Sequence, residues 1–372
     1  MENKALLAEK LLRERHEPMK HPVVSGFDGF VDEMISVVNE RRSLDDYDAV
    51  PDIATFGKLI SGAAGHSSLR EIVVNQVDAG GCAVNMGDGL VNFGLPLDLF
   101  ATLGEPEHPA FAELTRRCRT VESWGAEPGR TLAFEFADGK LMFSAVRQLA
   151  DLDASYVQQK LATGPYLKSC EEASLIALTD WTLYPHMTEV WKILCDEVYA
   201  KLPAGKRFMI DLVDPSSRSE EDIRAMLKVL PDISQNGVLT LGLNGNEANL
   251  LCRILGLPEG EDAEDSVATQ AVALRKALEI DEVAVHWIKY AAVDGPDGAA
   301  SITGPYCPKP KKSTGAGDRF NAGYVLSTVL GFAPWERLAI GTASSGFFVR
   351  EARSANLDEL AQFLIDWEGE TP

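Results

Sequence analysis

The sequence lacks the features that would place the protein in or on a membrane. Among its 372 residues, no run approaches the ~18 consecutive apolar residues that a membrane-spanning helix needs. Residues 1–17 mix both charge signs and contain no apolar stretch of the kind found in secretory signals. We therefore expect no membrane partner and a cytoplasmic location.

Basic residues are scarce. The chain has 35 Lys and Arg against 56 Asp and Glu, which gives a net charge of −21. Such a surface repels the phosphates of nucleic acids. We therefore expect no nucleic-acid partner, although a local basic site for a small anion stays compatible with this balance.

Paired metal-ligand and redox motifs are missing as well. The six cysteines are dispersed, none forms a C-x-x-C pair, and the six histidines occur singly. This pattern is typical of reduced, buried thiols. The sequence also lacks G-x-G-x-x-G after an early strand, because Gly80-Gly81-Cys82-Ala83 has the wrong spacing, and this argues against a dinucleotide-dependent oxidoreductase.

The second half of the chain alternates predicted strands and helices, which is typical of βαβ units and a mostly parallel sheet. We predict one α/β domain over residues 1–372, with a small β lid formed by segments near 33–50 and 131–147. Asp138-Gly139, between two apolar runs, predicts a hairpin in the second segment. A helix is expected over 111–119, and a strand over 282–288.

The strongest motif is Ser313-Thr314-Gly315-Ala316-Gly317-Asp318, which is followed by a helical pattern. Glycines allow backbone N–H groups at a helix N-terminus to converge on an oxyanion. A carboxylate beside such a hole can accept the proton of an attacking hydroxyl group. The alternative is a tight turn in which Asp318 only caps the helix.

The run T-G-A-G-D-x-F-x-A-G resembles the C-terminal signature of the ribokinase-like (PfkB) carbohydrate kinases. The resemblance covers about residues 21–350 and implies a three-layer α/β/α sandwich with a small β lid. It assigns Asp318 as the catalytic base, residues 315–317 (Gly315, Ala316 and Gly317) as the anion hole, and Thr314 to the nucleotide site.

The stretch Ala79-Gly80-Gly81-Cys82-Ala83-Val84-Asn85 is similar to the family's N-terminal signature, and this likeness implies that Gly80, Gly81 and Asn85 hold the substrate. A carboxylate after the first strand also binds sugar hydroxyls in the family. Asp32 is the favoured match because it precedes an apolar segment. Asp28 stays an alternative because the spacing from Gly26 to Asp32 is one residue longer than usual.

Two motifs match the family's phosphate side. Asn244-Gly245-Asn246-Glu247 is similar to N-x-x-E, which implies that Asn244 and Glu247 organise Mg²⁺ and phosphate, with Glu247 acting through water. The alternative for Glu247 is a carboxylate that stabilises the first turn of a helix. Asp214-Pro215-Ser216-Ser217-Arg218 is similar to the family's D-P-N-x-R.

The chain departs from the family where T-x-G-x-x-G normally contacts the nucleotide. Residues 286–291 (His-Trp-Ile-Lys-Tyr-Ala) lack both glycines. Either Lys289 and His286 replace the backbone contacts, or the nucleotide sits differently. Lys309, Lys311, Lys312 and Arg319 also form a basic cluster before and within the helix, which is either a phosphate-attracting site or a solvated loop.

The function that these observations imply is transfer of the γ-phosphate of ATP to a hydroxyl of a sugar or related small alcohol, with Mg²⁺ as cofactor. Two alternatives stay open at this point: an ADP-dependent sugar kinase, and a catalytically silent sugar- or nucleotide-binding relative that acts as a sensor. The resemblance also implies a homodimer formed through the lid.

Overall fold

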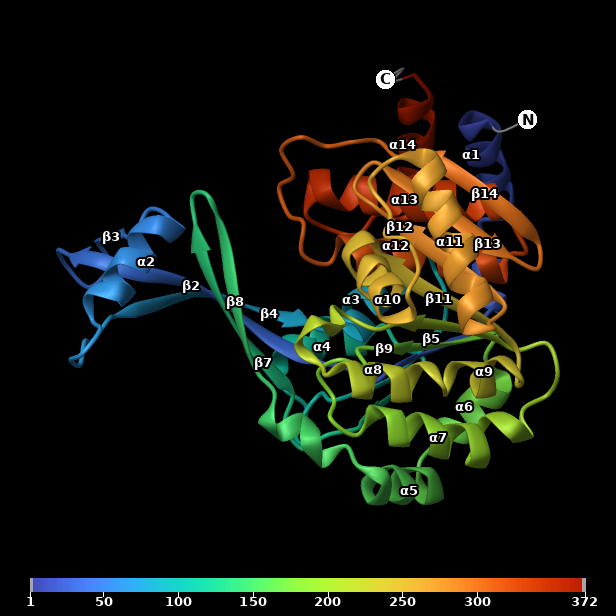
Figure 1. Cartoon of the computed structure of the whole chain (residues 1–372), viewed down its shortest axis with the longest axis horizontal. Coiled ribbons are helices and arrows are strands. Elements are labelled where there is room, and N and C mark those ends of the chain that lie inside the picture. The colour runs from blue at the N-terminus through green and yellow to red at the C-terminus, as the bar shows by residue number, and fades with distance from the viewer. Residues whose placement is uncertain (1–2, 370–372) are drawn as a thin grey trace.

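The computed structural model describes residues 3–369 and contains a large main sheet (Figure 1). Its strand order is β14-β13-β12-β11-β10-β9-β1-β5-β6. The strands from β12 to β6 run parallel, whereas β13 and β14 are added antiparallel at one edge. The bounds are β1 Val23–Gly26, β5 Leu97–Ala101, β6 Thr120–Ser123, β9 Leu175–Thr179, β10 Arg207–Asp211, β11 Val238–Asn244, β12 Glu282–His286, β13 Tyr290–Gly295 and β14 Gly298–Thr303.

Helices cover both faces of this sheet and bury two separate apolar cores. One face carries α5 Ala154–Thr163, α6 Tyr166–Glu172, α7 Met187–Glu197, α8 Glu220–Leu227, α9 Leu230–Ser234, α10 Gly245–Leu255 and α11 Glu264–Leu278. The other carries α1 Lys4–Arg13, α3 Cys82–Asn92, α4 Ala112–Thr115, α12 Ala316–Val329, α13 Pro334–Glu351 and α14 Leu357–Gly369. The fold is therefore the three-layer α/β/α sandwich that the sequence predicts.

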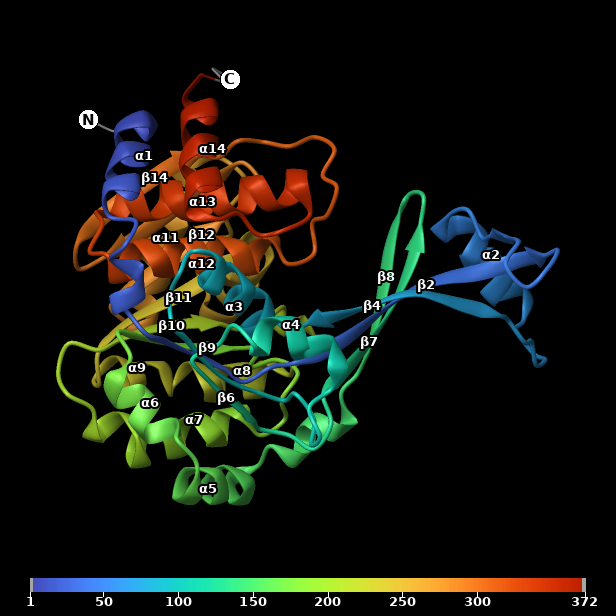
Figure 2. The same ribbon diagram turned by 180° about the vertical axis from the view of Figure 1, so that it is seen from behind.

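A smaller five-stranded sheet projects from the body of the molecule (Figures 1 and 2). It consists of β2 Phe30–Arg41, β3 Tyr47–Ala49, β4 Ile72–Gly80, β7 Gly129–Phe136 and β8 Gly139–Ala145, with α2 Ile53–Gly62 beside it. Strand β2 is the central strand, because it pairs with β3, β4 and β7. Phe56 of α2 packs on Phe134 and Phe136 of β7, at 5.9 and 5.3 Å between ring centroids. We call this sheet and α2 the lid.

The expected hairpin is confirmed, since β7 and β8 are joined through Ala137-Asp138 with Phe136 opposite Gly139. The expected helix over 111–119 is wrong. Only a 3₁₀ turn at Pro109–Phe111 and the short α4 form there, and the chain then enters β6. Arg119 returns to the sheet, since its N–H bonds the Leu97 carbonyl and its guanidinium pairs with the buried Asp98.

At the other edge of the sheet, β12 ends at His286, two residues before the predicted end of the strand, and a β13–β14 hairpin follows that the sequence analysis did not expect. Residues 291–300 are rich in Ala and Gly and carry no alternating pattern of β-branched residues, which explains the omission. Further 3₁₀ turns lie at Pro18–Lys20, Arg147–Asp151, Tyr199–Lys201 and Pro215–Ser217.

All six cysteines are free, but only half of them are buried as the sequence analysis expects. Cys170, Cys195 and Cys252 are buried, whereas Cys82, Cys118 and Cys307 are half-exposed. Within residues 3–369, none of the helices combines the length and apolar character that crossing a membrane requires.

Candidate active site

Helix α12 begins at the predicted anion hole. Gly315 precedes it with φ of 89°, a left-handed conformation that favours glycine, and Ala316 and Gly317 form its first turn. Asp318 follows in the same turn and is only 7% exposed. Burial, with a smaller contribution from the nearby Asp211, raises the pKa of Asp318 to about 7, although Arg319 and the Cys82 thiol act in the opposite direction. A carboxyl group with such a pKa can exchange a proton near neutral pH.

Asp28 fixes the start of α3. Its carboxylate accepts hydrogen bonds from the Cys82 N–H, from the Ala83 N–H at 2.8 Å and from the Thr179 hydroxyl at 2.5 Å. Gly81 has φ of 99°, and a Cβ there would lie 2.9 Å from the Asp28 carbonyl oxygen. Both oxygens of Asp28 are therefore engaged inside the protein, in a role that ties β1 and β9 to the N-terminus of α3.

Asp32 lies on β2, where the lid leaves the main sheet. A Cβ on Gly80 would lie 2.3 Å from Asp32 Oδ2, so the absence of a side chain at Gly80 makes room for this carboxylate. Burial raises the pKa of Asp32, while the Thr131 hydroxyl and Lys312 lower it. Of the two candidate carboxylates, Asp32 is thus the one that is not engaged at a helix terminus.

The two glycine-rich motifs meet, although more than 200 residues separate them in the sequence. A Cβ on Gly315 would lie 3.6 Å from Asn85 Nδ2, and the Cys82 thiol lowers the pKa of Asp318. Contacts with Asp28, which follows β1, and with Asp211, which ends β10, place the two motifs beside the carboxyl ends of parallel strands. Open α/β sheets bind ligands at this end. The structure therefore brings Gly80, Gly81 and Asn85 together with Gly315, Ala316, Gly317 and Asp318.

Arg319 makes its contacts on the inner side of α12. Its guanidinium bonds Ser354 Oγ at 3.1 Å and Asp88 Oδ2 at 3.3 Å, and lies 4.5 Å from the Phe348 ring centroid. A Cβ on Gly315 would be 2.9 Å from its Nη1. The Arg319 guanidinium therefore packs against the turn at Gly315. The other members of the basic cluster, Lys309, Lys311 and Lys312, lie on the loop that precedes this turn.

Asn244 and Glu247 form a capping box at the start of α10. The Asn244 side chain accepts the N–H groups of Asn246 and Glu247, and Glu247 Oε2 accepts the Asn244 N–H at 2.8 Å. Burial raises the pKa of Glu247 well above its usual range, and Asp211 adds to the shift. One carboxylate oxygen of Glu247 thus caps the first turn of α10, as the alternative in the sequence analysis predicts. The same carboxylate also interacts with the acidic group of Asp211.

The segment that lacks the family glycines forms the turn between β12 and β13. His286 lies against the anion hole, since a Cβ on Gly317 would be 3.6 Å from its Cε1. Burial lowers the pKa of His286 to about 4, so the ring is neutral at pH 7. Lys289 is exposed and its ammonium lies 5.4 Å from the Tyr306 ring centroid, while Thr314 is exposed beside Gly315.

Comparison with known proteins identifies the group to which this chain is related. The profile of the prokaryotic ketohexokinase family matches residues 7–367. The chain belongs to the prokaryotic ketohexokinase family. A ketohexokinase from Haloferax volcanii is 27% identical over 344 residues, which cover 92% of this chain and 90% of that protein. Membership makes the chain a carbohydrate kinase that transfers phosphate from ATP to a sugar.

Solved structures of sugar kinases share the fold of this ketohexokinase-family chain. A putative sugar kinase from Clostridium perfringens superposes with a TM-score of 0.64 at 15% identity, covering 93% of this chain and 96% of that one. Arabidopsis thaliana ribokinase complexed with ribose and ATP gives 0.61 at 16% identity, covering 93% and 98%. These likenesses confirm the ribokinase-like fold that the two signatures indicate.

Two carboxylates at the carboxyl ends of the strands, the half-buried Asp211 and the buried Asp180, were missed by the sequence analysis. Asp211 ends β10 and accepts the Asn321 amide at 2.5 Å, and Asp180 follows β9 and accepts the Leu183 N–H at 2.9 Å. Burial raises the pKa of both groups. The available signal was their position, because Asp180 comes shortly after one predicted strand and Asp211 lies within another, over residues 208–213.

The acids at this edge suit a water-retaining cation better than a protein-built metal cage. Among residues 3–369, no three His, Cys, Asp or Glu side chains are grouped closely enough to hold a metal ion directly. Yet Asp211 raises the pKa of both Glu247 and Asp318, and Asp318 also raises the pKa of Glu247, so negative charge gathers here. Mg²⁺ commonly binds with few protein ligands, several waters and substrate phosphates, and the residues present fit such a site.

Proposed function

We propose that this protein phosphorylates a ketohexose at a hydroxyl group, with Asp318 as the general base. The observation that carries the assignment is the buried carboxyl of Asp318, with a pKa raised to about 7, at the start of α12 beside the left-handed Gly315. The ketohexose is inferred from the family and from the haloarchaeal relative. Small alcohols outside the sugars fit this site less well, since Asp32 and Asn85 offer an acceptor and a donor to polyol hydroxyls.

In the proposed mechanism, Asp32, Asn85 and the backbone at Gly80 and Gly81 hold the sugar with one hydroxyl next to Asp318. Asp318 accepts the proton as that oxygen attacks the γ-phosphorus of ATP in line, while the bond from this phosphorus to the β–γ bridging oxygen breaks and ADP leaves. The backbone N–H groups of residues 315–317 stabilise the negative charge on the transferring phosphoryl group. Asp28 acts indirectly by holding the start of α3, so Asp32 rather than Asp28 is proposed as the sugar-binding carboxylate.

The nucleotide is proposed to lie along α10 and the turn after β12. Asn244 and Glu247 organise the phosphate side, and Glu247 would hold Mg²⁺ through water, where the cation supplies positive charge to the phosphates. Thr314 contributes to the same side. Lys289 replaces one of the missing glycine contacts with a charged side chain, and the neutral ring of His286 packs beside the hole.

The lid motivates the proposal of a homodimer. Several of its apolar side chains are exposed, which is unusual for a surface that meets only water. They are Ile60, Ile72, Val74, Val77, Met142 and Phe143. We also propose a cytoplasmic location, in keeping with the free thiols.

A coupled assay of the purified protein tests the function. Ketohexoses, aldohexoses, ribose and nucleosides are each offered with MgATP or MgADP, and turnover is expected with a ketohexose and ATP. Turnover only with an aldose would overturn the substrate, and turnover only with ADP would overturn the donor. Nucleotide binding without turnover across the panel would overturn the catalytic assignment in favour of a sensor.

A further inference from the structure

A polar pocket lies near the amino-terminal ends of the parallel strands, opposite the candidate active site. It has a volume of about 390 Å³ and is lined by residues of α1, β10, the β13–β14 turn, the end of α12 and the start of α13. Arg207 is the first residue of β10, whereas the catalytic groups cluster at the carboxyl ends of the strands. Thr328, ten residues after Asp318 on α12, places the pocket roughly 15 Å along that helix from the base.

Three hydrogen-bond donors at this pocket have no partner among the described residues. They are Arg207 Nη1, Arg337 Nε and Thr328 Oγ1. The Arg337 and Thr328 residues are 1% and 4% exposed, and all three donor atoms are buried from water. Leaving a buried donor unpaired costs free energy, and a bound ion is one explanation of such donors in native proteins.

The neighbouring carboxylates pair only in part with the guanidinium groups of Arg207 and Arg337. Buried Glu282 takes Arg337 Nη2 at 2.8 Å, but it also accepts the Thr240 and Tyr324 hydroxyls. Asp297 approaches both arginines loosely, at 3.7 Å from Arg207 and 3.5 Å from Arg337. A charge-assisted bond to a carboxylate is usually 2.7–2.9 Å. Asp297 is half exposed and lies in the two-residue turn between β13 and β14, so it can swing out.

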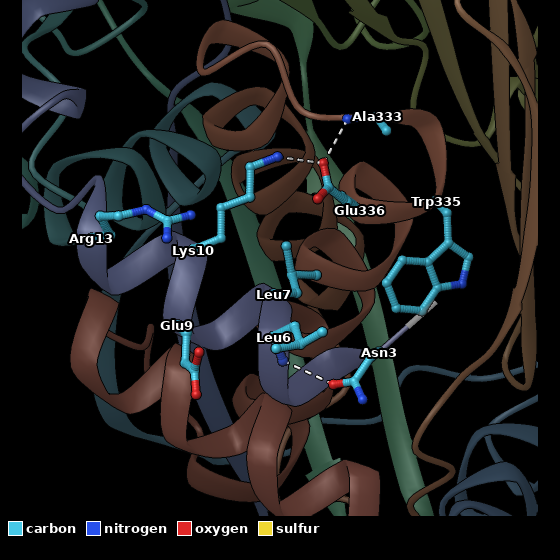
Figure 3. Close-up of a pocket in the computed structure, with 9 residues that line it drawn as sticks. All are labelled: Asn3, Leu6, Leu7, Glu9, Lys10, Arg13, Ala333, Trp335 and Glu336. Carbon is cyan, nitrogen blue, oxygen red and sulfur yellow. Dashed lines mark hydrogen bonds and ion pairs between the residues drawn. The ribbon is translucent and has the colours of Figure 1, made fainter. Parts of the chain in front are cut away.

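On the α1 side, the wall of the pocket is an ion pair. Figure 3 shows the Lys10 ammonium reaching the carboxylate of Glu336, at 2.7 Å, while the same carboxylate accepts the N–H of Ala333. Glu336 is thereby neutralised by Lys10 and by the start of α13. The positive charges left for a ligand are those of Arg207 and Arg337, and Asp297 is the lining carboxylate that competes for them, since Glu336 is paired with Lys10.

We propose that this pocket binds a small oxyanion, a phosphate or carboxylate group, between Arg207, Arg337 and Thr328, and that Asp297 occupies its place when the oxyanion is absent. Two guanidinium groups and a hydroxyl match the acceptors of such a group. The pocket volume exceeds the size of an inorganic ion and leaves room for the rest of a small metabolite. The site goes beyond the proposed sugar kinase reaction, and it does not depend on the identity of the sugar.

Calorimetric titration with inorganic phosphate tests the site. The full-length protein is first saturated with a non-hydrolysable ATP analogue and Mg²⁺, so that the catalytic anion hole is occupied, and ionic strength is held constant. Arg207→Gln and Thr328→Val are expected to weaken binding about tenfold, because each removes a bond to a charged group. Arg253→Gln removes an exposed arginine on α10 and is expected to leave binding unchanged.

Asp297→Asn provides the converse test, because a purely structural role of these residues would not lead to tighter phosphate binding. It removes the competing charge from an exposed turn and is expected to tighten phosphate binding several-fold. A second arm with acetate identifies the source, because preference for acetate assigns the site to carboxylates and preference for phosphate assigns it to phosphates. Absence of binding of either ion by the wild-type protein, or equal binding by wild type, Arg207→Gln and Asp297→Asn, would overturn the proposal.

Discussion

The Asp318 carboxyl group is buried among other acids, and its raised pKa follows from that position. General-base catalysis typically contributes 10²–10⁴-fold to a rate. We expect Asp318→Asn to lower kcat by about a thousandfold and to leave the KM for sugar within a few-fold, because Asn keeps the shape and removes only the proton acceptor. Steady-state assays of both parameters check this prediction.

The matched control for this variant is Asp265→Asn, which neutralises an exposed acid in the first turn of α11 and should retain full activity. Near-normal turnover by Asp318→Asn would exclude the proposed base. A large rise in KM at unchanged kcat would instead make Asp318 a sugar-binding residue.

The pH dependence of the reaction has a predictable sign. Asp318 accepts a proton only when it is ionised, so kcat/KM should rise with pH and level off above about 7. Below that value the slope should approach tenfold per pH unit. Initial rates at subsaturating sugar and saturating MgATP measure the profile, and a flat profile from pH 5.5 to 8 would contradict it.

Stability should change with pH in the opposite direction. Since the folded pKa of Asp318 lies above the ordinary value of 3.8, the folded state binds more protons than the unfolded state between about pH 4 and 7. The free energy of unfolding therefore falls as pH rises through this window. At pH 8, Asp318→Asn should be more stable than the wild type by about 2–4 kcal/mol in urea melts, and a less stable variant would contradict the desolvation of this group.

At the scale of elements, the packing of α3 on α12 sets the distance between the two glycine motifs. A Cβ on Gly89 of α3 would lie 2.6 Å from the Cβ of Ala322 on α12. Gly89→Ala should therefore push the helices apart, destabilise the protein by about 1–3 kcal/mol, and lower kcat because Asp318 and Asn85 lose their alignment. Urea denaturation and steady-state kinetics measure the two effects.

Gly57 offers the matched control, because it lies within α2 and a Cβ there meets no atom within 4 Å. Gly57→Ala should raise stability by up to about 1 kcal/mol, since alanine favours helix more than glycine does. If Gly89→Ala gave the same gain and full activity, the close contact of α3 and α12 would not position the site.

At the scale of the whole molecule, the sequence predicts most of the parallel sheet, because most of its strands are short apolar runs next to a helical pattern. Strand β6 was not expected, since its sequence Thr-Val-Glu-Ser has only one apolar residue. The sequence also predicts the glycine turn and the helix that begins after it, because a left-handed residue such as Gly315 favours glycine. The β13–β14 hairpin was missed, since its Ala- and Gly-rich strands are defined by pairing with β12 rather than by their own pattern.

The candidate site shows the same limit. The role of Asp28 could not be separated from that of Asp32 by spacing, because the decision rests on three contacts that bring Cys82, Ala83 and Thr179 to one carboxylate. The function of Arg319 was equally hidden, since its partners Asp88 and Ser354 come from α3 and the segment after α13. Long-range contacts of this kind have no signature in a single sequence.

The lid gives the last prediction. Strand β4 is an edge strand that pairs only with β2 and exposes Ile72, Val74 and Val77, and Phe143 of β8 is exposed as well. An apolar edge of this kind needs a cover. We expect a dimer in sedimentation equilibrium, and we expect Val74→Lys to dissociate it and to raise the KM for sugar, because β2 carries Asp32 from the lid into the site.

Leu6→Lys is the matched control, since it adds the same charge at an exposed apolar residue of α1 on the main body, and it should leave both the dimer and the KM unchanged. Wild-type protein that sediments as a monomer would contradict the lid interface. A Val74→Lys variant that is monomeric but keeps its KM would support the lid dimer and contradict its link to sugar binding. Asp32 would then be held within its own protomer, by Gly80 and Thr131 alone.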